Sequence, residues 1–164
     1  MTSQEVFRTL GDAIRAGDTE AVLTMFRRDP SLLDMITPFG SWLHVAASRG
    51  RLEIVRGLVD MGADVDLRAG TFDGAPINLA AANGHEDIVR CLLGVGATLD
   101  VSEPERNPLF SAVYGGHIAI VQLLIEAGID PCIRYTGDSM KDMDARAFAI
   151  ERGQLDIAAY LADV

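Results

Sequence analysis

Three stretches of the chain decide its fold: GRLEIVRGLVDMG at residues 50–62, GHEDIVRCLLGVG at 84–96 and GHIAIVQLLIEAG at 116–128. Each begins and ends with glycine, and the apolar residues between the glycines recur at helical spacing, which predicts an amphipathic helix. A glycine just beyond the apolar residues is typical of a helix end, because glycine adopts the left-handed conformation without a steric penalty. The three stretches therefore predict three copies of the same helix.

The first glycine of each stretch belongs to a longer periodic series. The series consists of glycines 32 to 37 residues apart: Gly17, Gly50, Gly84, Gly116 and Gly153. A short segment of small residues precedes the middle three, at Ala46-Ala47, Ala80-Ala81 and Ala112-Val113, and predicts a second, closely packed helix. One helix pair of this size cannot bury its own apolar face, so only a stack of pairs is stable. We therefore expect an all-α solenoid of about five helix-turn-helix units, with short extended fingers between them.

The composition argues against several classes of protein. The formal net charge of the 164 residues is −10, and such a surface repels phosphate backbones, so we expect no binding to nucleic acid. We also expect no membrane association, because there is no secretory signal and no apolar run of about 20 residues. Cys91 and Cys132 lie far apart, which favours reduced thiols and a cytoplasmic location.

No arrangement of residues points to catalysis or to a bound cofactor. The histidines His44, His85 and His117 recur at the repeat spacing and not at the spacing of metal ligands. Gly94 and Gly96 end a predicted helix, whereas the glycines of a phosphate-binding loop open one. No Ser/His/Asp set shows a spacing that suggests catalysis. We therefore expect a protein that is not an enzyme and holds no cofactor or metal.

The unit resembles the ankyrin repeat, whose pattern runs Thr-Pro-Leu-His, Ala-Ala, Gly-His, Ile-Val, Leu-Leu and Gly-Ala. The residues that carry the resemblance are Leu43-His44, Ala46-Ala47, Gly50, Ile54-Val55 and Gly62-Ala63; then Pro76, Ala80-Ala81, Gly84-His85, Ile88-Val89, Leu92-Leu93 and Gly96-Ala97; then Pro108-Leu109, Gly116-His117, Ile120-Val121 and Leu123-Leu124. The resemblance implies a single domain, 1–164, with units near 5–36, 37–70, 71–103, 104–136 and 137–164, of which the first and last are caps. It also implies that the histidines bond to backbone groups and hold neighbouring units in register.

The resemblance further implies a partner-binding surface, made by the concave ends of the first helices and by the finger tips. The helix positions that match are Ser48, Arg49, Ala82, Asn83, Tyr114, Gly115, Glu151 and Arg152. The finger positions are Phe39, Trp42, Arg68, Phe72, Asp73, Glu103, Glu105, Arg106, Arg134, Tyr135, Asp138, Lys141 and Asp142. Aromatic residues mixed with charges are typical of an interface. An alternative remains open for two of them, since Trp42 could cover the joint to the N-terminal unit and Phe39 could staple the same helix.

Two functions fit such a surface, and in both the partner is another protein. The first is inhibition, because short acidic ankyrin proteins resemble bacterial immunity proteins, which neutralise toxins such as nucleases. A basic partner would then meet the acidic residues of the fingers: Asp73, Glu103, Glu105, Asp138 and Asp142. The second is a scaffold or adaptor, in a bacterial regulatory complex or as an effector directed at a host protein, that leaves its partner active. We expect the chain by itself to be monomeric.

Overall fold

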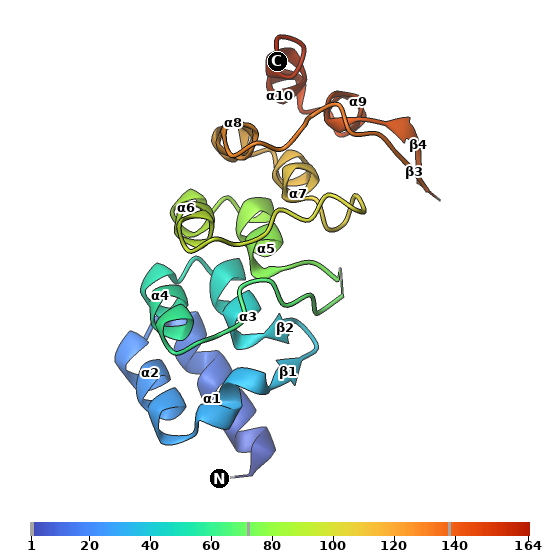
Figure 1. Cartoon of the computed structure of the whole chain (residues 1–164). Helices are drawn as coiled ribbons and strands as arrows, with labels where there is room; N and C mark the ends of the chain where they lie inside the picture. The colour runs from blue at the N-terminus through green and yellow to red at the C-terminus, as the bar shows by residue number, and fades with distance from the viewer. Residues whose placement is uncertain (1, 72, 138) are drawn as a thin grey trace.

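The computed structural model describes residues 2–71, 73–137 and 139–164, and the helices in this part of the chain follow one another in consecutive pairs. The pairs are α1 (Ser3–Ala16) with α2 (Thr19–Arg28), α3 (Trp42–Ser48) with α4 (Leu52–Asp60), α5 (Pro76–Ala82) with α6 (Glu86–Gly94), α7 (Pro108–Gly115) with α8 (Ile118–Glu126), and α9 (Ala145–Glu151) with α10 (Leu155–Tyr160). Figure 1 shows them stacked in a row from α1–α2 at one end to α9–α10 at the other. The predicted helical solenoid is confirmed.

Four extended segments, which we call fingers 1 to 4, connect the pairs and project from the same side of the stack (Figure 1). Finger 1 (residues 35–41) follows the short 3-10 helix η1 (Pro30–Asp34) and contains the antiparallel strands β1 (Ile36–Thr37) and β2 (Gly40–Ser41). Finger 2 (residues 63–75) is closed by a bridge between Ala69 and Gly74, and finger 3 spans residues 97–107. Finger 4 (residues 129–144) contains the antiparallel strands β3 (Tyr135–Gly137) and β4 (Met140–Met143).

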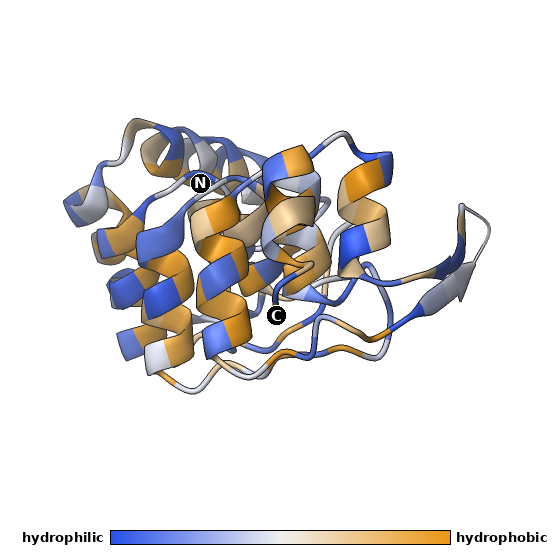
Figure 2. Cartoon of the chain, turned by 90° about the horizontal axis from the view of Figure 1, so that it is seen from above, coloured by the Kyte–Doolittle hydropathy of each residue, from blue (hydrophilic) through white to orange (hydrophobic). Residues whose placement is uncertain are grey.

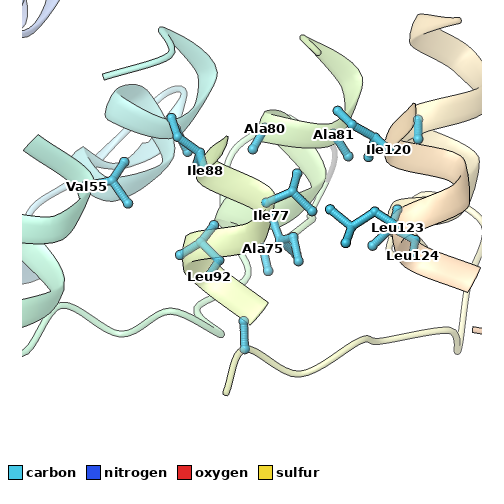
Figure 3. Packing of buried hydrophobic residues seen from close by; sticks show 14 of the residues in the cluster. Val55, Ala75, Ile77, Ala80, Ala81, Ile88, Leu92, Ile120, Leu123 and Leu124 are labelled. Atoms are coloured by element: carbon cyan, nitrogen blue, oxygen red, sulfur yellow. The ribbon is translucent and has the colours of Figure 1, made fainter. Parts of the chain in front are cut away.

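The core lies between the helix pairs, as the repeated apolar pattern predicts. Nine residues of the second helices α4, α6 and α8 are at most 1% exposed: Ile54, Val55, Leu58, Ile88, Val89, Leu92, Ile120, Val121 and Leu124. Figure 3 shows Ala81 of α5 lying toward Ile120 of α8. The small residues of one pair thus leave room for the large residues of the next pair to pack closely. The opposite sides of these helices carry polar residues, which alternate with the apolar ones along each helix in Figure 2.

One position of the repeat, directly after the first glycine, fixes the register between neighbouring pairs. His85 Nε2 lies 3.1 Å from the carbonyl oxygen of Ser48, and His117 Nε2 lies 3.2 Å from that of Ala82. Arg51 occupies the same position and donates from Nε to the carbonyl of Ile14 at 3.1 Å. The structural role predicted for His85 and His117 is confirmed, and Arg51 extends it to the N-terminal pair.

The third histidine, His44, links α3 to finger 2. Its side chain is fully buried, and its Nδ1 accepts a hydrogen bond from the N–H of Ser41 at 3.2 Å. The proton of the neutral ring therefore lies on Nε2, which donates to the carbonyl of Gly74 at 3.0 Å. Burial lowers the pKa of His44 below its ordinary value and so favours this neutral form.

Candidate functional site

A groove of about 170 Å³ lies between the tips of fingers 1 and 2 and the helices α3 and α5. Its lining consists of Phe39, His44, Val45, Ser48, Arg49, Ala69, Gly70, Thr71, Gly74, Asn78 and Leu79. Phe39 is 67% exposed, which is unusual for a phenylalanine and identifies this groove as the best-formed candidate for contact with a partner. We call it the Phe39 groove.

The backbone beneath Phe39 is tightly held. The buried hydroxyl of Thr37 donates to the carbonyl of Gly40 at 2.7 Å and accepts the N–H of Phe39 at 3.0 Å. Gly40 has a φ of +98°, and a Cβ there would lie 2.6 Å from the ring of His44, so only glycine fits. A Cβ on Gly70 would lie 3.0 Å from the carbonyl carbon of Phe39, which shows how closely finger 2 supports finger 1. Phe39 is thus an exposed ring on a preorganised base and does not staple α3.

Trp42 does not belong to this surface, contrary to the partner-contact role considered from the sequence. Its side chain is only 2% exposed, and its ring lies 5.3 Å from the ring of Phe7 on α1. The alternative interpretation is therefore the better one: Trp42 covers the joint to the N-terminal pair. This packing leaves the indole Nε1 of Trp42 buried without a hydrogen-bond partner among the described residues.

Tyr135, which was also predicted to contact a partner, is buried as well. It is 9% exposed, and its hydroxyl donates to the carbonyl of Val101 at 2.7 Å while accepting from the amide of Asn107 at 3.0 Å. Its ring meets the ring of Phe110 edge to face, with 5.1 Å between the centroids. Burial raises the pKa of its hydroxyl. Tyr135 therefore fastens finger 4 to finger 3 and is not available to a partner.

Two other predicted contact residues, Tyr114 and Arg152, lie together at the C-terminal ends of α7 and α9. The ring of Tyr114 is 58% exposed, and the guanidinium of Arg152 lies over it at 4.4 Å from the centroid. A guanidinium over an aromatic face is attracted by the ring, so the two side chains are held against each other. The neighbouring Glu151 is exposed.

Five of the charged residues predicted on the fingers, Arg68, Asp73, Arg106, Arg134 and Asp142, form ion pairs with residues of the fingers. Arg106 contacts Asp73 at 2.7 Å and Arg68 lies 3.8 Å from Asp100, so both pairs connect finger 2 to finger 3. In finger 4, Arg134 contacts Asp142 at 2.8 Å and Asp144 at 2.7 Å, and the bond from Arg134 lowers the pKa of Asp142. The acidic character of the finger edge is therefore smaller than the sequence suggested.

Glu103 and Glu105 at the tip of finger 3 differ from these pairs. Both are exposed, and neither forms a salt bridge with another described residue. Lys141 is also exposed, while Asn83 is exposed with its amide bonded to the carbonyl of Leu79 at 2.8 Å. The predicted contacts Phe72 and Asp138 lie outside the described residues.

A second, more open hollow of about 530 Å³ lies between fingers 2 and 3. The carboxylate of Asp66 at its wall accepts both the N–H and the hydroxyl of Thr98, at 2.7 and 2.8 Å. Arg68 and Arg106, which also line it, carry the salt bridges described above. Since these groups satisfy one another, the hollow offers a ligand little that is not already bonded.

Of the residues that line the Phe39 groove, only Phe39, Ser48 and Arg49 were predicted from the sequence, and the missed ones include two large apolar side chains. Val45 and Leu79 are half-buried apolar side chains in its lining, each directly after the fourth residue of its opening tetrad, His44 and Asn78. An apolar residue at that same position in two successive units was the signal that could have found them. Both are intermediate in burial, and Val45 also packs against the core.

Within the described residues, no three of the His, Cys, Asp and Glu side chains gather closely enough to hold a metal ion. In the same part of the chain, no helix has the length and apolar character that crossing a bilayer requires.

Comparison with protein families agrees with the geometry of the stack. A family model described as ankyrin repeats (3 copies) matches residues 43–135 and 78–164, which together span most of the chain. No curated protein matched the sequence. The matched residues cover the helix pairs from α3 onward, with their intervening fingers and the positions of all three histidines. The chain therefore belongs to the ankyrin-repeat family.

Proposed function

We propose that this chain binds another protein through the Phe39 groove and the adjoining finger tips, and that it occludes the bound surface. Ankyrin repeats are generally protein–protein interaction modules and typically non-catalytic. The observation that carries the proposal is the 67% exposed ring of Phe39, held on a rigid base beside an apolar groove. A preorganised aromatic anchor loses little conformational entropy on binding, which is a property of interface hot spots.

The charge of the chain supports a basic partner. The formal net charge is −10, and Glu103 and Glu105 extend from finger 3 without a salt bridge to a described residue. Unlike charges would steer the two proteins together, so the association rate should fall as salt is added. The partner would then place an apolar side chain in the Phe39 groove and basic side chains near finger 3.

Occlusion of a basic partner is the action of an immunity-type inhibitor, and we propose this role as the finer function. The acidity of the chain and its resemblance to bacterial immunity proteins support it. Cys91 and Cys132 are free thiols, which supports a cytoplasmic site of action.

A second candidate function, the adaptor that leaves its partner active, is favoured by one observation. The helices α3 and α5 contain no Asp, Glu, Lys or Arg within their bounds, so their part of the groove wall is uncharged up to Arg49 at the end of α3. A contact dominated by this wall, with Phe39 and Tyr114, would be insensitive to salt. The activity of the bound partner, measured with and without the chain, separates the two functions.

The test begins with affinity capture from the native cell and mass spectrometry, followed by binding measurements with the recovered partner. Phe39→Ala should weaken binding by about 2 kcal/mol, roughly thirtyfold, without changing the melting temperature. Val95→Ala is the matched control, because Val95 is also exposed (49%) but lies at the end of α6, away from the groove. Unchanged affinity in Phe39→Ala would sink the proposed site. Recovery of several weak partners, none harmful when expressed alone, would remove the inhibitor role.

A further inference from the structure

A single cation interrupts the otherwise uncharged lining that the structure describes for the Phe39 groove. The lining consists of apolar and small polar residues together with His44 and Arg49. His44 is fully buried, and burial lowers its pKa and favours the neutral ring. At neutral pH, Arg49 therefore carries the formal charge of the described lining. A chain with a net charge of −10 thus presents a positive charge at the place proposed for contact with a partner.

The guanidinium of Arg49 is free to bind an added carboxylate. Arg49 is exposed and forms no salt bridge with another described residue. The arginines of the fingers differ, because Arg68, Arg106 and Arg134 each lie 2.7 to 3.8 Å from a carboxylate of the chain. A carboxylate from a partner would not have to displace one of these described carboxylates from Arg49.

The acidic residue at the rim of the groove is held by another arginine. Asp73 precedes Gly74, which lines the groove. Its carboxylate accepts two hydrogen bonds from Arg106, from Nη2 at 2.7 Å and from Nε at 3.2 Å. Because the charge of Asp73 is offset by that of Arg106, it opposes an incoming carboxylate less than an unpaired Asp would.

The rest of the groove favours a large apolar side chain. Val45 of α3 and Leu79 of α5 line it beneath the 67% exposed ring of Phe39, and its volume is about 170 Å³. Burial of apolar surface against these three side chains stabilises an aliphatic or aromatic residue of a partner.

Arg49 stands one helical turn beyond this apolar part of the groove. Its N–H donates to the carbonyl of Val45 at 3.1 Å, and both side chains line the same groove. Residues four apart on a helix have their Cβ atoms about 5–6 Å apart. Residues two apart in an extended chain are separated by roughly 7 Å. One partner segment can therefore meet Val45 with one side chain and Arg49 with a second side chain at most two positions away.

We infer that the groove binds a protein segment that carries a large apolar residue with Asp or Glu within two positions of it. The apolar side chain packs on Phe39, Val45 and Leu79, and the carboxylate pairs with Arg49. A guanidinium presents a planar pair of N–H donors that matches both oxygens of a carboxylate.

The inference rests on the proposed function and adds the local sequence that the partner carries. A protein with a basic surface can contain such a segment, because the acidic tip of finger 3 lies outside the lining of the groove. The acidic residue of the segment would then meet the end of α3, and the basic surface around the segment would meet finger 3.

A library of random, unmodified peptides displayed on phage and selected on the full 164-residue chain provides the test. We expect the selected peptides to share a large apolar residue with Asp or Glu within two positions. Selection on Arg49→Glu should exchange this acidic residue for Lys or Arg, because the charge of the site is reversed. Arg28→Glu is the matched control and should select the wild-type pattern, since Arg28 is exposed at the end of α2 and outside the described lining.

A synthetic peptide from the wild-type selection measures the size of the effect. Arg49→Gln should weaken its binding about fivefold at low ionic strength and less at high ionic strength, because salt screens an exposed ion pair. Phe39→Ala should weaken it roughly thirtyfold. Arg49 is exposed, so its variants should keep the melting temperature of the wild type.

The possible failures separate this inference from the proposed function. Selected peptides that require Phe39 but carry no acidic residue near the apolar one would overturn the inference and leave the groove as a binding site. An acidic preference that persists in Arg49→Glu would do the same. Peptides that bind equally well to Phe39→Ala, or a selection that enriches no peptide, would contradict the groove itself and the inference with it.

Discussion

The joint between α5–α6 and α7–α8 adds polar side-chain bonds to its apolar packing, whereas the joint between α7–α8 and α9–α10 adds a cluster of aromatic rings. In the first joint, Asn78 donates to the carbonyl of Arg106 at 2.9 Å and to the hydroxyl of Ser111 at 3.2 Å. In the second, Phe110 stacks on Phe148 with 5.2 Å between the centroids and meets Tyr135 edge to face. Asn78 and Phe110 occupy the same position in the repeat. At this position, one unit therefore uses hydrogen bonds and the next uses aromatic contacts.

The difference teaches what each kind of interaction contributes. A buried amide has directional bonds, so it specifies the register of two pairs but gives a modest net free energy. An aromatic cluster buries a large apolar area and gives more free energy with less directional control. Apolar burial therefore holds both joints, and the middle joint gains register from hydrogen bonds while the last joint gains buried area from its aromatic rings.

The largest effect is expected from Phe110→Ala. The side chain is 4% exposed and touches two rings, so its removal should cost about 3–5 kcal/mol of unfolding free energy. Because Phe110 contacts Phe148 and Tyr135 at the last joint, hydrogen exchange should accelerate in α9–α10 well before it does in α3–α6. Phe26→Ala, at a buried site in α2, is the control that destabilises the chain without touching this joint. Equal protection of α7–α8 and α9–α10 in Phe110→Ala would contradict the comparison.

Asn78→Ala should cost less, about 1–3 kcal/mol, because it leaves the N–H of Ala75 and the carbonyl of Arg106 without their partner. Urea denaturation measures the loss. Asn78→His is the matched variant, since His44 at the equivalent position of the preceding unit makes the corresponding bond to Gly74. If the histidine variant were no more stable than the alanine variant, the bond would not be what holds this joint.

Acid should weaken the joint that contains His44 and leave the aromatic joint unaffected. Burial lowers the folded-state pKa of His44 below its ordinary value of 6.5, so the unfolded chain binds the proton more readily. The stabilisation is present above pH 6.5 and is lost as the pH falls from there through the folded-state pKa. Denaturation midpoints from pH 7.5 to about 5 should therefore decline more in the wild type than in His44→Asn, which cannot titrate. Parallel curves would disprove this account.

The smallest effect is expected from Arg106→Gln, which removes the exposed ion pair with Asp73. Exposed ion pairs contribute little and are screened by salt. The melting temperature should fall slightly at low ionic strength and not measurably at high ionic strength. A loss as large as that of Asn78→Ala would mean that charges, and not the amide, hold the middle joint.

The fold was predictable from the sequence to a large extent, and the site only in part. The glycine spacing and the apolar pattern placed the helix pairs, and the recurrence of histidine at one position placed the ladder of His85 and His117. Of the aromatic residues predicted to contact a partner, Phe39 and Tyr114 are exposed, whereas Trp42 and Tyr135 are buried. Nothing in the local pattern separates these two groups.

The periodicity of the chain determined the stacked helix pairs by itself, because each helix requires only local spacing and each pair requires only a neighbour of the same kind. The tertiary structure alone decided which of the residues predicted to contact a partner are accessible. Phe7 from α1 covers Trp42, and Phe110 from α7 covers Tyr135. The rings that cover Trp42 and Tyr135 come from other helices, α1 and α7, and not from neighbours in the local sequence, so the local pattern does not encode these contacts.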